Sequence, residues 1–246
     1  MHLLEIENLN IEFPNRHGTE VAVDNVSLTI NAGEILGLVG ESGAGKSTIG
    51  NGIVQLLSKP GRVSSGKVTL NGKVISGLQG ESIRKIHPMT SLNPLFTIEN
   101  QMVETIVNCL GVSNKEALER SIELLKKVGI PEPEVRIKQY PHQFSGGMRQ
   151  RVVIAIALSG EPDLIIADEP TTALDVSVQD QILKLIQDLC TDLQVGCMLV
   201  THDMGVIANV TDRVAVLYRG KLVEIGATKD VLGNPQHAYT QSLISA

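Results

Sequence analysis

Gly40-Glu41-Ser42-Gly43-Ala44-Gly45-Lys46-Ser47 is the stretch from which the fold can be predicted. It follows a short apolar run, Glu34–Val39, and precedes Ser47–Leu57, which has the length of a helix, so the local unit is strand, loop, helix. The octapeptide matches GxxxxGK[ST], in which glycines let backbone N–H groups curl around phosphate oxygens at a helix N-terminus. A glycine-rich turn that merely resembles this pattern is the alternative, and the flanking strand and helix argue against it.

Two side chains of this stretch add chemistry to its backbone. We expect Lys46 to reach the β- and γ-phosphates of a nucleotide and the Ser47 hydroxyl to ligate Mg²⁺. The sequence therefore predicts a nucleotide site, and the residues expected to form it are Gly40, Glu41, Ser42, Gly43, Ala44, Gly45, Lys46, Ser47 and Thr48.

A pair of acids ends a second apolar run. Leu164-Ile165-Ile166-Ala167-Asp168-Glu169 places two carboxylates at the end of a buried strand, where Asp168 can hold the Mg²⁺ shell and Glu169 can orient an attacking water. Acids at a strand end are often solvent-facing caps, but a phosphate loop upstream needs a metal-binding acid. We therefore expect hydrolysis as well as binding.

A second potential phosphate site lies further along the chain. Phe144–Gln150 reads FSGGMRQ, in which Ser145, Gly146 and Gly147 offer a hydroxyl and two exposed backbone amides at the start of a helix. Taken alone this signal is weak, because Ser-Gly-Gly is a common turn at the start of a helix.

Composition narrows the class of protein. Hydrophobic residues make up 42% and charged residues 20% of the 246 residues, as in a folded globular chain. The net charge of −6 argues against broad electrostatic binding to nucleic acid. Cys109, Cys190 and Cys197 are odd in number and lack CxxC spacing, which favours reduced thiols and a cytosolic compartment. No apolar run approaches the roughly 20 residues that span a bilayer, so a membrane role requires a partner.

The rest of the chain shows strand and helix patterns. Leu3–Ile30 alternates apolar and polar residues around turn signals, which predicts strands and hairpins, and Lys67–Leu70 predicts another strand before a tight turn. Helical periodicity covers Ile98–Leu110 and Lys115–Val128. From Ser145 onward helix and strand patterns alternate, which favours a mainly parallel sheet flanked by helices.

Taken in order, these motifs resemble the ABC ATPase family: the phosphate loop, the FSGGM signature, the acidic strand LIIADE, Thr172-Ala173-Leu174-Asp175, and His202. The resemblance covers nearly the whole chain. It implies an α/β fold of the P-loop NTPase (RecA-like) class, with a mainly parallel sheet core, an antiparallel β subdomain and a helical signature subdomain. It also implies one ABC ATPase domain over residues 1–246, with the core and β subdomain at about 1–88 and 159–246 and the helical subdomain at about 89–158.

The same resemblance implies roles for single residues. It implies a head-to-tail dimer in which ATP lies between the phosphate loop of one subunit and Ser145–Gly147 of the other. His202 would contact the γ-phosphate and act in catalysis with Glu169, although a lone histidine is usually structural. Asp175 would couple the two sites across the dimer. Phe13 lies where the family stacks an aromatic ring on adenine, and a plain core phenylalanine is the alternative. The implied cofactors are ATP and Mg²⁺.

Three stretches resemble the dipeptide, oligopeptide and nickel importer branch of this family: Pro88–Leu95 (PMTSLNPL), Tyr140–Phe144 (YPHQF) and Asn234–Thr240 (NPQHAYT), with Ala238 where the branch usually has proline. Peptide-importer subunits generally continue into a cysteine-bearing tail, so this chain is more similar to the shorter nickel-type subunits. The implied partners are two membrane-spanning permease subunits, a second ABC ATPase that is identical or paralogous and, indirectly, a solute-binding protein. The implied location is the cytoplasmic face of the inner membrane, without a nucleic-acid partner.

One departure from this branch concerns the strand before PMTSLNPL. The branch normally has an apolar strand ending in a glutamine that helps to place Mg²⁺ and water, whereas Ile86 stands at the glutamine position here. Neither Gln79 nor Gln101 has the family context, and His87 is a weak substitute. A strand's length of residues, on the order of ten, is absent. Residues missing from the sequence as written, an in-frame deletion, or replacement by Val74–Ile86 in an unusual register could explain this. The abrupt return of the match favours the first two.

If the segment is truly absent, the sequence predicts a lost core strand, unpaired backbone at the sheet edges and slower ATP hydrolysis. The function implied by the resemblance is ATP hydrolysis that energises the import of dipeptides, oligopeptides or nickel. Two alternatives stay open. One is an impaired nucleotide-binding subunit that pairs with a competent paralogue. The other is an ABC ATPase acting on nucleic acid or ribosomes, although such proteins usually have paired cassettes or long inserted arms.

Overall fold

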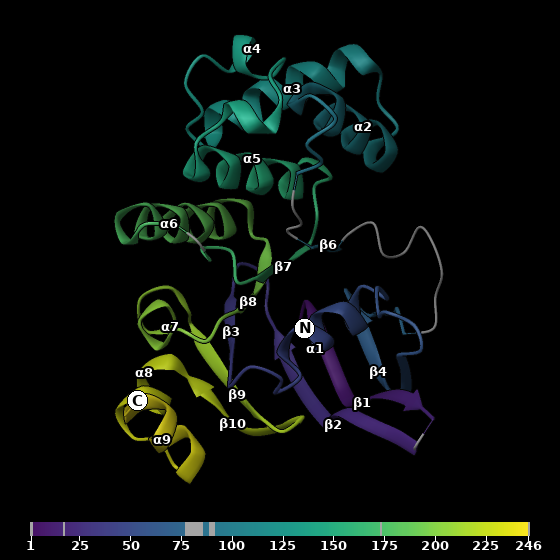
Figure 1. The fold of residues 1–246 in the computed structure, drawn as a ribbon, viewed down its shortest axis with the longest axis vertical. Helices are drawn as coiled ribbons and strands as arrows, with labels where there is room; N and C mark the ends of the chain where they lie inside the picture. The colour runs from purple at the N-terminus through teal and green to yellow at the C-terminus, as the bar shows by residue number, and fades with distance from the viewer. Residues whose placement is uncertain (1, 17, 77–85, 89–91, 173, 246) are drawn as a thin grey trace.

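The computed structural model describes residues 2–16, 18–76, 86–88, 92–172 and 174–245. Its strands form two sheets (Figure 1). The first is antiparallel and contains, in spatial order, β2 (Gly18–Ile30), β1 (Leu4–Asn15), β4 (Arg62–Leu70) and β5 (Lys73–Val74). The second contains, in spatial order, β10 (Lys221–Ala227), β9 (Arg213–Tyr218), β3 (Ile35–Val39), β8 (Gly196–Val200), β7 (Leu164–Asp168) and β6 (Ile86–Pro88).

The second sheet is parallel from β9 through β3, β8 and β7 to β6, while β10 pairs antiparallel with β9. Successive residues of β7 point to opposite faces of this sheet. Leu164 and Ile166 join the core cluster that contains the antiparallel sheet and α1, whereas Ile165 and Ala167 join the cluster formed with the other helices. Because both faces are covered, the strand reads as an unbroken apolar run in the sequence.

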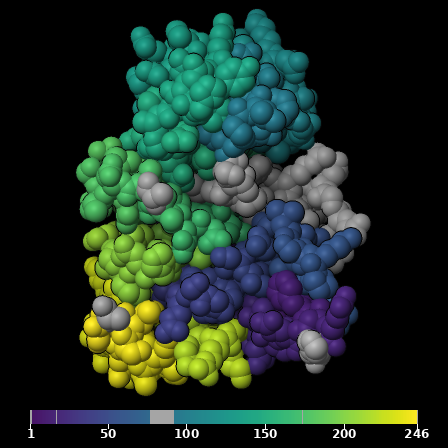
Figure 2. Space-filling model, in the orientation of Figure 1, coloured from purple at the N-terminus to yellow at the C-terminus, as the bar shows by residue number. Residues whose placement is uncertain are grey.

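Helices cover the second sheet and form a lobe at one end of the molecule. They are α1 (Lys46–Ile53), α2 (Ile98–Leu110), α3 (Asn114–Lys127), α4 (Pro133–Arg136), α5 (Gly146–Ser159), α6 (Val176–Leu193), α7 (Met204–Val210), α8 (Thr228–Gly233) and α9 (Ala238–Ser245). Figure 2 shows the residues of α2 to α5 as a lobe at one end, with the C-terminal residues, in yellow, at the other.

Side-chain caps begin the three longer helices of this lobe. Thr97, Ser113 and Ser145 each accept a backbone N–H of the first helical turn at 3.2–3.3 Å, which satisfies one of the donors that a helix start leaves unpaired. The short helix α1 differs from them, because its N-cap is Gly45 and no side chain caps it. Its first N–H groups are therefore available to a ligand.

The fold class predicted from the sequence is confirmed. The strand at β3 and the helix at α2 lie where the periodicity predicted them, and α5 begins directly after Ser145. The helix predicted over Ser47–Leu57 is shorter than expected and ends at Ile53. Gln55 then adopts a left-handed conformation with φ 57°, which an α-helix does not accommodate.

The expected loss of a core strand is wrong for the described residues. Ile86–Pro88 forms β6, which pairs in parallel register with Leu164–Ile166 at the edge of the sheet. Backbone groups left unpaired along β7 would cost free energy, and these three residues pair with part of that edge. Pro88 lacks an N–H group but is tolerated because it ends an edge strand.

The search for membrane spans covered the described residues. None of their helices is both long enough and apolar enough to cross a bilayer.

A side chain at Gly37 in β3 should force its buried neighbours to shift. A Cβ atom there would lie 2.5 Å from Cδ1 of buried Ile207 and 3.0 Å from Cγ2 of Thr211. Overpacking of this kind costs about 1–3 kcal/mol, so Gly37→Ala should lower the urea midpoint of unfolding. The matched control is Gly233→Ala, whose Cβ would meet nothing within 4 Å. Equal midpoints for the two variants would contradict this packing.

Candidate active site

The carboxyl ends of three neighbouring parallel strands meet at one edge of the second sheet. β3 ends at Val39 before the phosphate loop, β7 ends at Asp168, and β8 ends at Val200. Asp168 lies opposite Val200 in the ladder, and β8 in turn pairs with β3. Ligands of open α/β sheets bind in the crevice outside such strand ends, so the topology itself brings the predicted motifs together.

The loop between β3 and α1 depends on glycine at its turning points. Gly40, Gly43 and Gly45 have φ angles of 152°, 81° and 101°, which residues with a side chain rarely adopt. A Cβ atom at Gly45 would lie 2.6 Å from the Ala22 carbonyl oxygen. This conformation opens directly into the uncapped start of α1. Unpaired N–H groups at a helix N-terminus suit phosphate, so the loop fits the phosphates of a nucleotide.

Lys46 is buried within the loop that precedes it. Only 7% of the residue is exposed, and Nζ donates to the carbonyl oxygens of Gly40 at 2.7 Å and Glu41 at 2.9 Å. An ammonium has three N–H groups, so one remains for an anion. Burial lowers the pKa of Lys46, and the carboxylates of Glu169 and Asp168 oppose that change by favouring the charged form.

Glu169 follows β7 in a left-handed conformation with φ 46° and donates its N–H to the Val200 carbonyl at 2.9 Å. Its side chain accepts two hydrogen bonds. His202 Nδ1 lies 2.9 Å from Oε1, and the Thr172 hydroxyl donates to Oε2 at 3.1 Å. The hydrogen bond from His202, more than that from Thr172, lowers the pKa of Glu169 against the effect of burial. The carboxylate is thereby held ionised and oriented.

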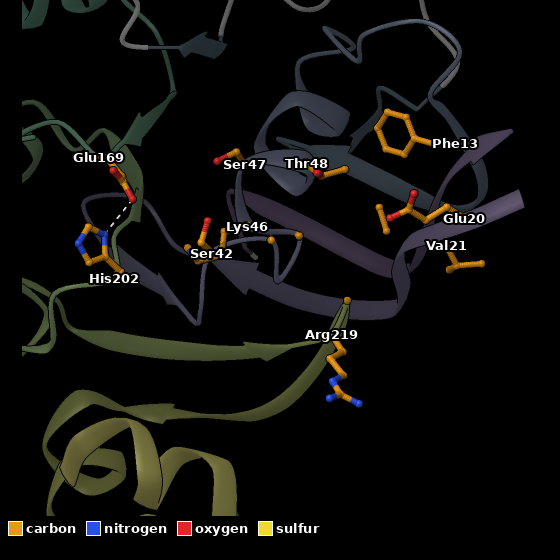
Figure 3. A pocket seen from close by; sticks show the side chains of 14 residues that line it. Phe13, Glu20, Val21, Ser42, Lys46, Ser47, Thr48, Glu169, His202 and Arg219 are labelled. Atoms are coloured by element: carbon orange, nitrogen blue, oxygen red, sulfur yellow. Dashed lines mark hydrogen bonds and ion pairs between the residues drawn. The ribbon is translucent and has the colours of Figure 1, made fainter. Parts of the chain in front are cut away.

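A cavity of about 870 Å³ joins these groups. Its lining residues are Phe13, Glu20, Val21, Ala22, Ser42, Gly43, Gly45, Lys46, Ser47, Thr48, Glu169, His202, Arg219 and Gly220. Figure 3 shows the Glu169–His202 pair at one end of the cavity and Phe13 and Arg219 at the other, with Lys46 and Ser47 between them. The phosphate loop therefore lies between an acid–histidine pair and a wall that carries an aromatic ring.

Phe13 belongs both to the edge of the hydrophobic core and to the wall of the cavity. The side chain packs against the core cluster and touches Gly61, where a Cβ would lie 2.5 Å from ring atom Cε1. It also lines the cavity, next to Glu20 and opposite Arg219 in Figure 3. Neither Glu20 nor Arg219 was predicted. The one sequence signal for these two residues is their position beside turns. The pairing of Phe13 with Glu20 across β1 and β2 can be seen only in the folded sheet.

The candidate Mg²⁺ ligands come from the start of α1 and from the end of β7. Ser47 lines the cavity in the first turn of α1. Asp168 is the exposed last residue of β7 and is absent from the cavity lining, but its charge acts on Lys46. A hydroxyl and a carboxylate are ligands that Mg²⁺ accepts alongside substrate phosphates, so the donor set fits that ion.

The signature residues lie outside this cavity. Ser145 caps α5, and the start of that helix rests on the start of α6: a Cβ at Gly146 would lie 3.4 Å from Leu174 Cδ2, and one at Gly147 would lie 2.7 Å from Val178 Cγ1. Asp175 is the N-cap of α6. The structure thus brings the signature and the segment around Asp175 side by side, but not into the site that contains Lys46.

The glutamines weighed in the sequence analysis can now be placed in part. Gln101 braces the loop before α2: its Nε2 donates to the Asn93 and Phe96 carbonyls, and its Oε1 accepts the Asn93 N–H. It is therefore engaged away from the cavity. Gln79 lies outside the described residues, and His87 belongs to β6.

Comparison with known families settles the class of this fold. A family described as ABC transporter matches residues 23–172, more than half of the chain. The chain belongs to the ABC transporter family. The family resemblance expected from the ordered motifs is therefore confirmed.

Two curated relatives match nearly the whole chain. The peptidoglycan transport ATP-binding protein YejF of Agrobacterium fabrum is 47% identical over 99% of this chain, but the chain spans only 47% of that relative. The dipeptide transport ATP-binding protein DppD of Bacillus subtilis is 46% identical over 99% of this chain and 76% of its own length. The latter alignment runs over 255 residues, more than the 246 of this chain, so the relative carries residues that this chain lacks.

A solved structure supports the fold and the activity. The ATP-binding cassette MJ0796, in a dimeric post-hydrolysis state bound to ADP and phosphate, has a TM-score of 0.79 and 29% identity to this chain. The match covers 92% of this chain and 98% of the cassette. The chain is accordingly an ABC-type ATPase.

The hydrogen bond between His202 and Glu169 makes a prediction about acidity. His202→Ala should raise the pKa of the Glu169 carboxyl toward its ordinary value, because the largest influence that lowers it is removed. A lowered pKa stabilises the folded protein above the unfolded-state pKa, and this contribution is lost as pH falls through the folded-state pKa. His202→Ala should lose part of this contribution to the stability of the fold.

A carbon-13 NMR titration of the Glu169 carboxyl measures this pKa directly. The control is His142→Ala. His142 stacks on Tyr140 with 5.7 Å between the ring centroids, and it is not one of the two hydrogen-bond partners described for the Glu169 side chain. If the Glu169 carboxyl has the same pKa in both variants as in the unmodified protein, His202 is not what lowers it.

Proposed function

We propose that this chain is the ATP-hydrolysing subunit of an ABC importer for peptides. The observation that carries the proposal is the cavity in which one phosphate loop faces an ionised glutamate held by a histidine. The relatives described above bear the names of dipeptide and peptidoglycan transport proteins. These names favour peptides over nickel as the solute class.

The described residues suggest how ATP is handled. The amides of the loop and the ammonium of Lys46 hold the phosphates, and Phe13 packs against the adenine at the far end of the cavity. Ser47 and Asp168 would hold Mg²⁺, which would supply charge neutralisation when bound. Glu169 orients the attacking water. His202 donates to Glu169 and lines the same cavity, and its role toward the γ-phosphate is part of this proposal.

Phosphoryl transfer requires positioning and charge stabilisation more than covalent chemistry by the protein. Lys46 meets this requirement because its ammonium is already desolvated and fixed to the loop. Glu169 meets it because two donors fix its carboxylate before substrate arrives. Preorganised groups of this kind need no reorganisation during the reaction.

The assembly we propose is a dimer that completes the site. Ser145–Gly147 and Asp175 lie outside the cavity of their own chain, so we assign them to the nucleotide of a second ATPase subunit. The start of α5 can serve this role, because Ser145 accepts a backbone N–H and still has its hydroxyl hydrogen to donate. Two permease subunits would anchor this dimer at the cytoplasmic face of the membrane.

An impaired subunit is the weaker alternative. Lys46, Glu169 and His202 all line the cavity with their hydrogen bonds formed, which favours a competent site in this chain. The alternative arises only from the sequence before Met89, where the glutamine of the importer branch has no counterpart. Replacing Glu169 in this subunit alone, within the complete transporter, distinguishes the two, because an impaired subunit would contribute no turnover to lose.

Glu169→Gln tests the hydrolytic role. The change keeps the size of the side chain and removes its charge, so Mg²⁺–ATP should still bind, while turnover should fall by about 10²–10⁴-fold as for the loss of a base. The measurements are phosphate release by the assembled transporter and equilibrium binding of ATP. Glu119→Gln, the same change on an exposed position of α3, is the control. Undiminished phosphate release in Glu169→Gln would refute the role.

A further inference from the structure

Tyr239 of the C-terminal helix α9 contacts the phosphate loop. Its phenol oxygen accepts the backbone N–H of Glu41 at 2.9 Å, across a separation of 198 residues. We propose that Tyr239 is a positioning residue that holds the phosphate loop in the conformation that binds nucleotide. The proposal rests on the nucleotide-binding function proposed above. The family match ends at residue 172, so this contact comes from a part of the chain beyond it.

Glu41 is held from both sides of its backbone. Its N–H donates to Tyr239, and its carbonyl oxygen accepts from Lys46 Nζ at 2.9 Å and from the Ala44 N–H at 3.1 Å. The ammonium that serves the phosphates and the phenol of α9 therefore fix the same residue. If Glu41 rotates, the carbonyl that binds Lys46 moves as well.

The tyrosine is itself fixed by several contacts. Its ring packs against the cluster that contains Val39, the last residue of β3 before the loop, and lies 4.2 Å from the Tyr218 ring centroid to centroid. Its N–H donates to His237 Nδ1 at 3.1 Å. The Glu224 carboxylate accepts the N–H groups of Gln236 at 2.8 Å and His237 at 3.1 Å, which ties the segment before α9 to β10.

The hairpin between β9 and β10 supports the same loop from beside the tyrosine. Gly220 donates its N–H to the Ala44 carbonyl at 3.0 Å and accepts the Asp24 N–H at 2.8 Å. Gly40 has no room for a Cβ because the Leu217 carbonyl oxygen occupies that space. The C-terminal part of the chain thus touches the loop at Gly40, Glu41 and Ala44, and Tyr239 supplies the side-chain hydrogen bond among these contacts.

The phenol is suited to this task. A phenol is neutral at physiological pH, and burial raises the pKa of Tyr239 further, so its neutral oxygen can accept the Glu41 N–H. The loop is exposed at Glu41 and Ser42, so its conformation depends on such contacts. When only a fraction of molecules has the competent conformation, the apparent dissociation constant rises in inverse proportion to that fraction.

Tyr239→Phe is the informative variant, because it keeps the ring on Tyr218 and removes only the acceptor. With purified protein and Mg²⁺–ATP in calorimetric titration, we expect the dissociation constant to rise about threefold to tenfold, the range for loss of one neutral hydrogen bond. In the assembled transporter, KM for ATP should rise by a similar factor with kcat unchanged, because bound nucleotide restores the loop conformation.

Tyr218→Phe is the matched control, since it removes the same hydroxyl one ring away and keeps the stack. Its affinity for ATP should stay within twofold of the unmodified protein. The thermal unfolding temperature of each variant without nucleotide separates a structural role from a positioning role. A lower unfolding temperature for Tyr239→Phe with unchanged ATP affinity would overturn the proposal, as would equal affinities for both variants.

Failure of the proposed function looks different from failure of this inference. If the unmodified protein and Tyr218→Phe both fail to bind Mg²⁺–ATP, the nucleotide site itself is wrong. If both bind and Tyr239→Phe binds equally well, the site stands and Tyr239 does not position its loop.

Discussion

Lys46 keeps a charged ammonium where only 7% of the residue is exposed, and the protein must compensate the loss of hydration. The carbonyl oxygens of Gly40 and Glu41 provide that compensation through two hydrogen bonds. To point both carbonyls inward, the backbone must curl, and the positive φ angles of Gly40, Gly43 and Gly45 permit it. The same curl directs N–H groups outward at the start of α1. One loop conformation therefore binds the Lys46 ammonium through its carbonyl groups and offers its N–H groups to an anion.

The surrounding sheet supports a loop of this shape. β3 fixes where the loop begins. The parallel strands β8 and β7 bring His202 and Glu169 to the same edge, because the carboxyl ends of parallel strands lie at one edge of a sheet. Glu169 pairs its own N–H with Val200, so its left-handed backbone is anchored to the strand that leads to His202. From the other side, the β9–β10 hairpin and Tyr239 contact the loop backbone.

Much of the site could be predicted because its elements are local in sequence. The phosphate loop, the apolar strand that ends in Asp168 and Glu169, and the helix start at Ser145 each follow from a short run of residues with a direct physical meaning. The sequence showed Thr172 as part of a motif but not its hydrogen bond to Glu169, because that bond depends on the turn between the two residues. Glu20, Arg219 and Tyr239 could not be placed at the loop, because their separation from it along the chain hides the contact.

β6 is a strand that the sequence did not predict but the structure contains. The sequence predicts the loss of a strand before Met89, but Ile86–Pro88 forms a short strand that pairs with β7, because a sheet edge accepts any backbone able to satisfy its hydrogen bonds. The sequence by itself predicts the chemistry, since Lys46, Ser47, Asp168, Glu169 and His202 are residue types that suit phosphate, metal and water. Only the tertiary structure decided which of these groups share a cavity and what holds the loop, because those contacts join residues brought together by strand order and not by spacing.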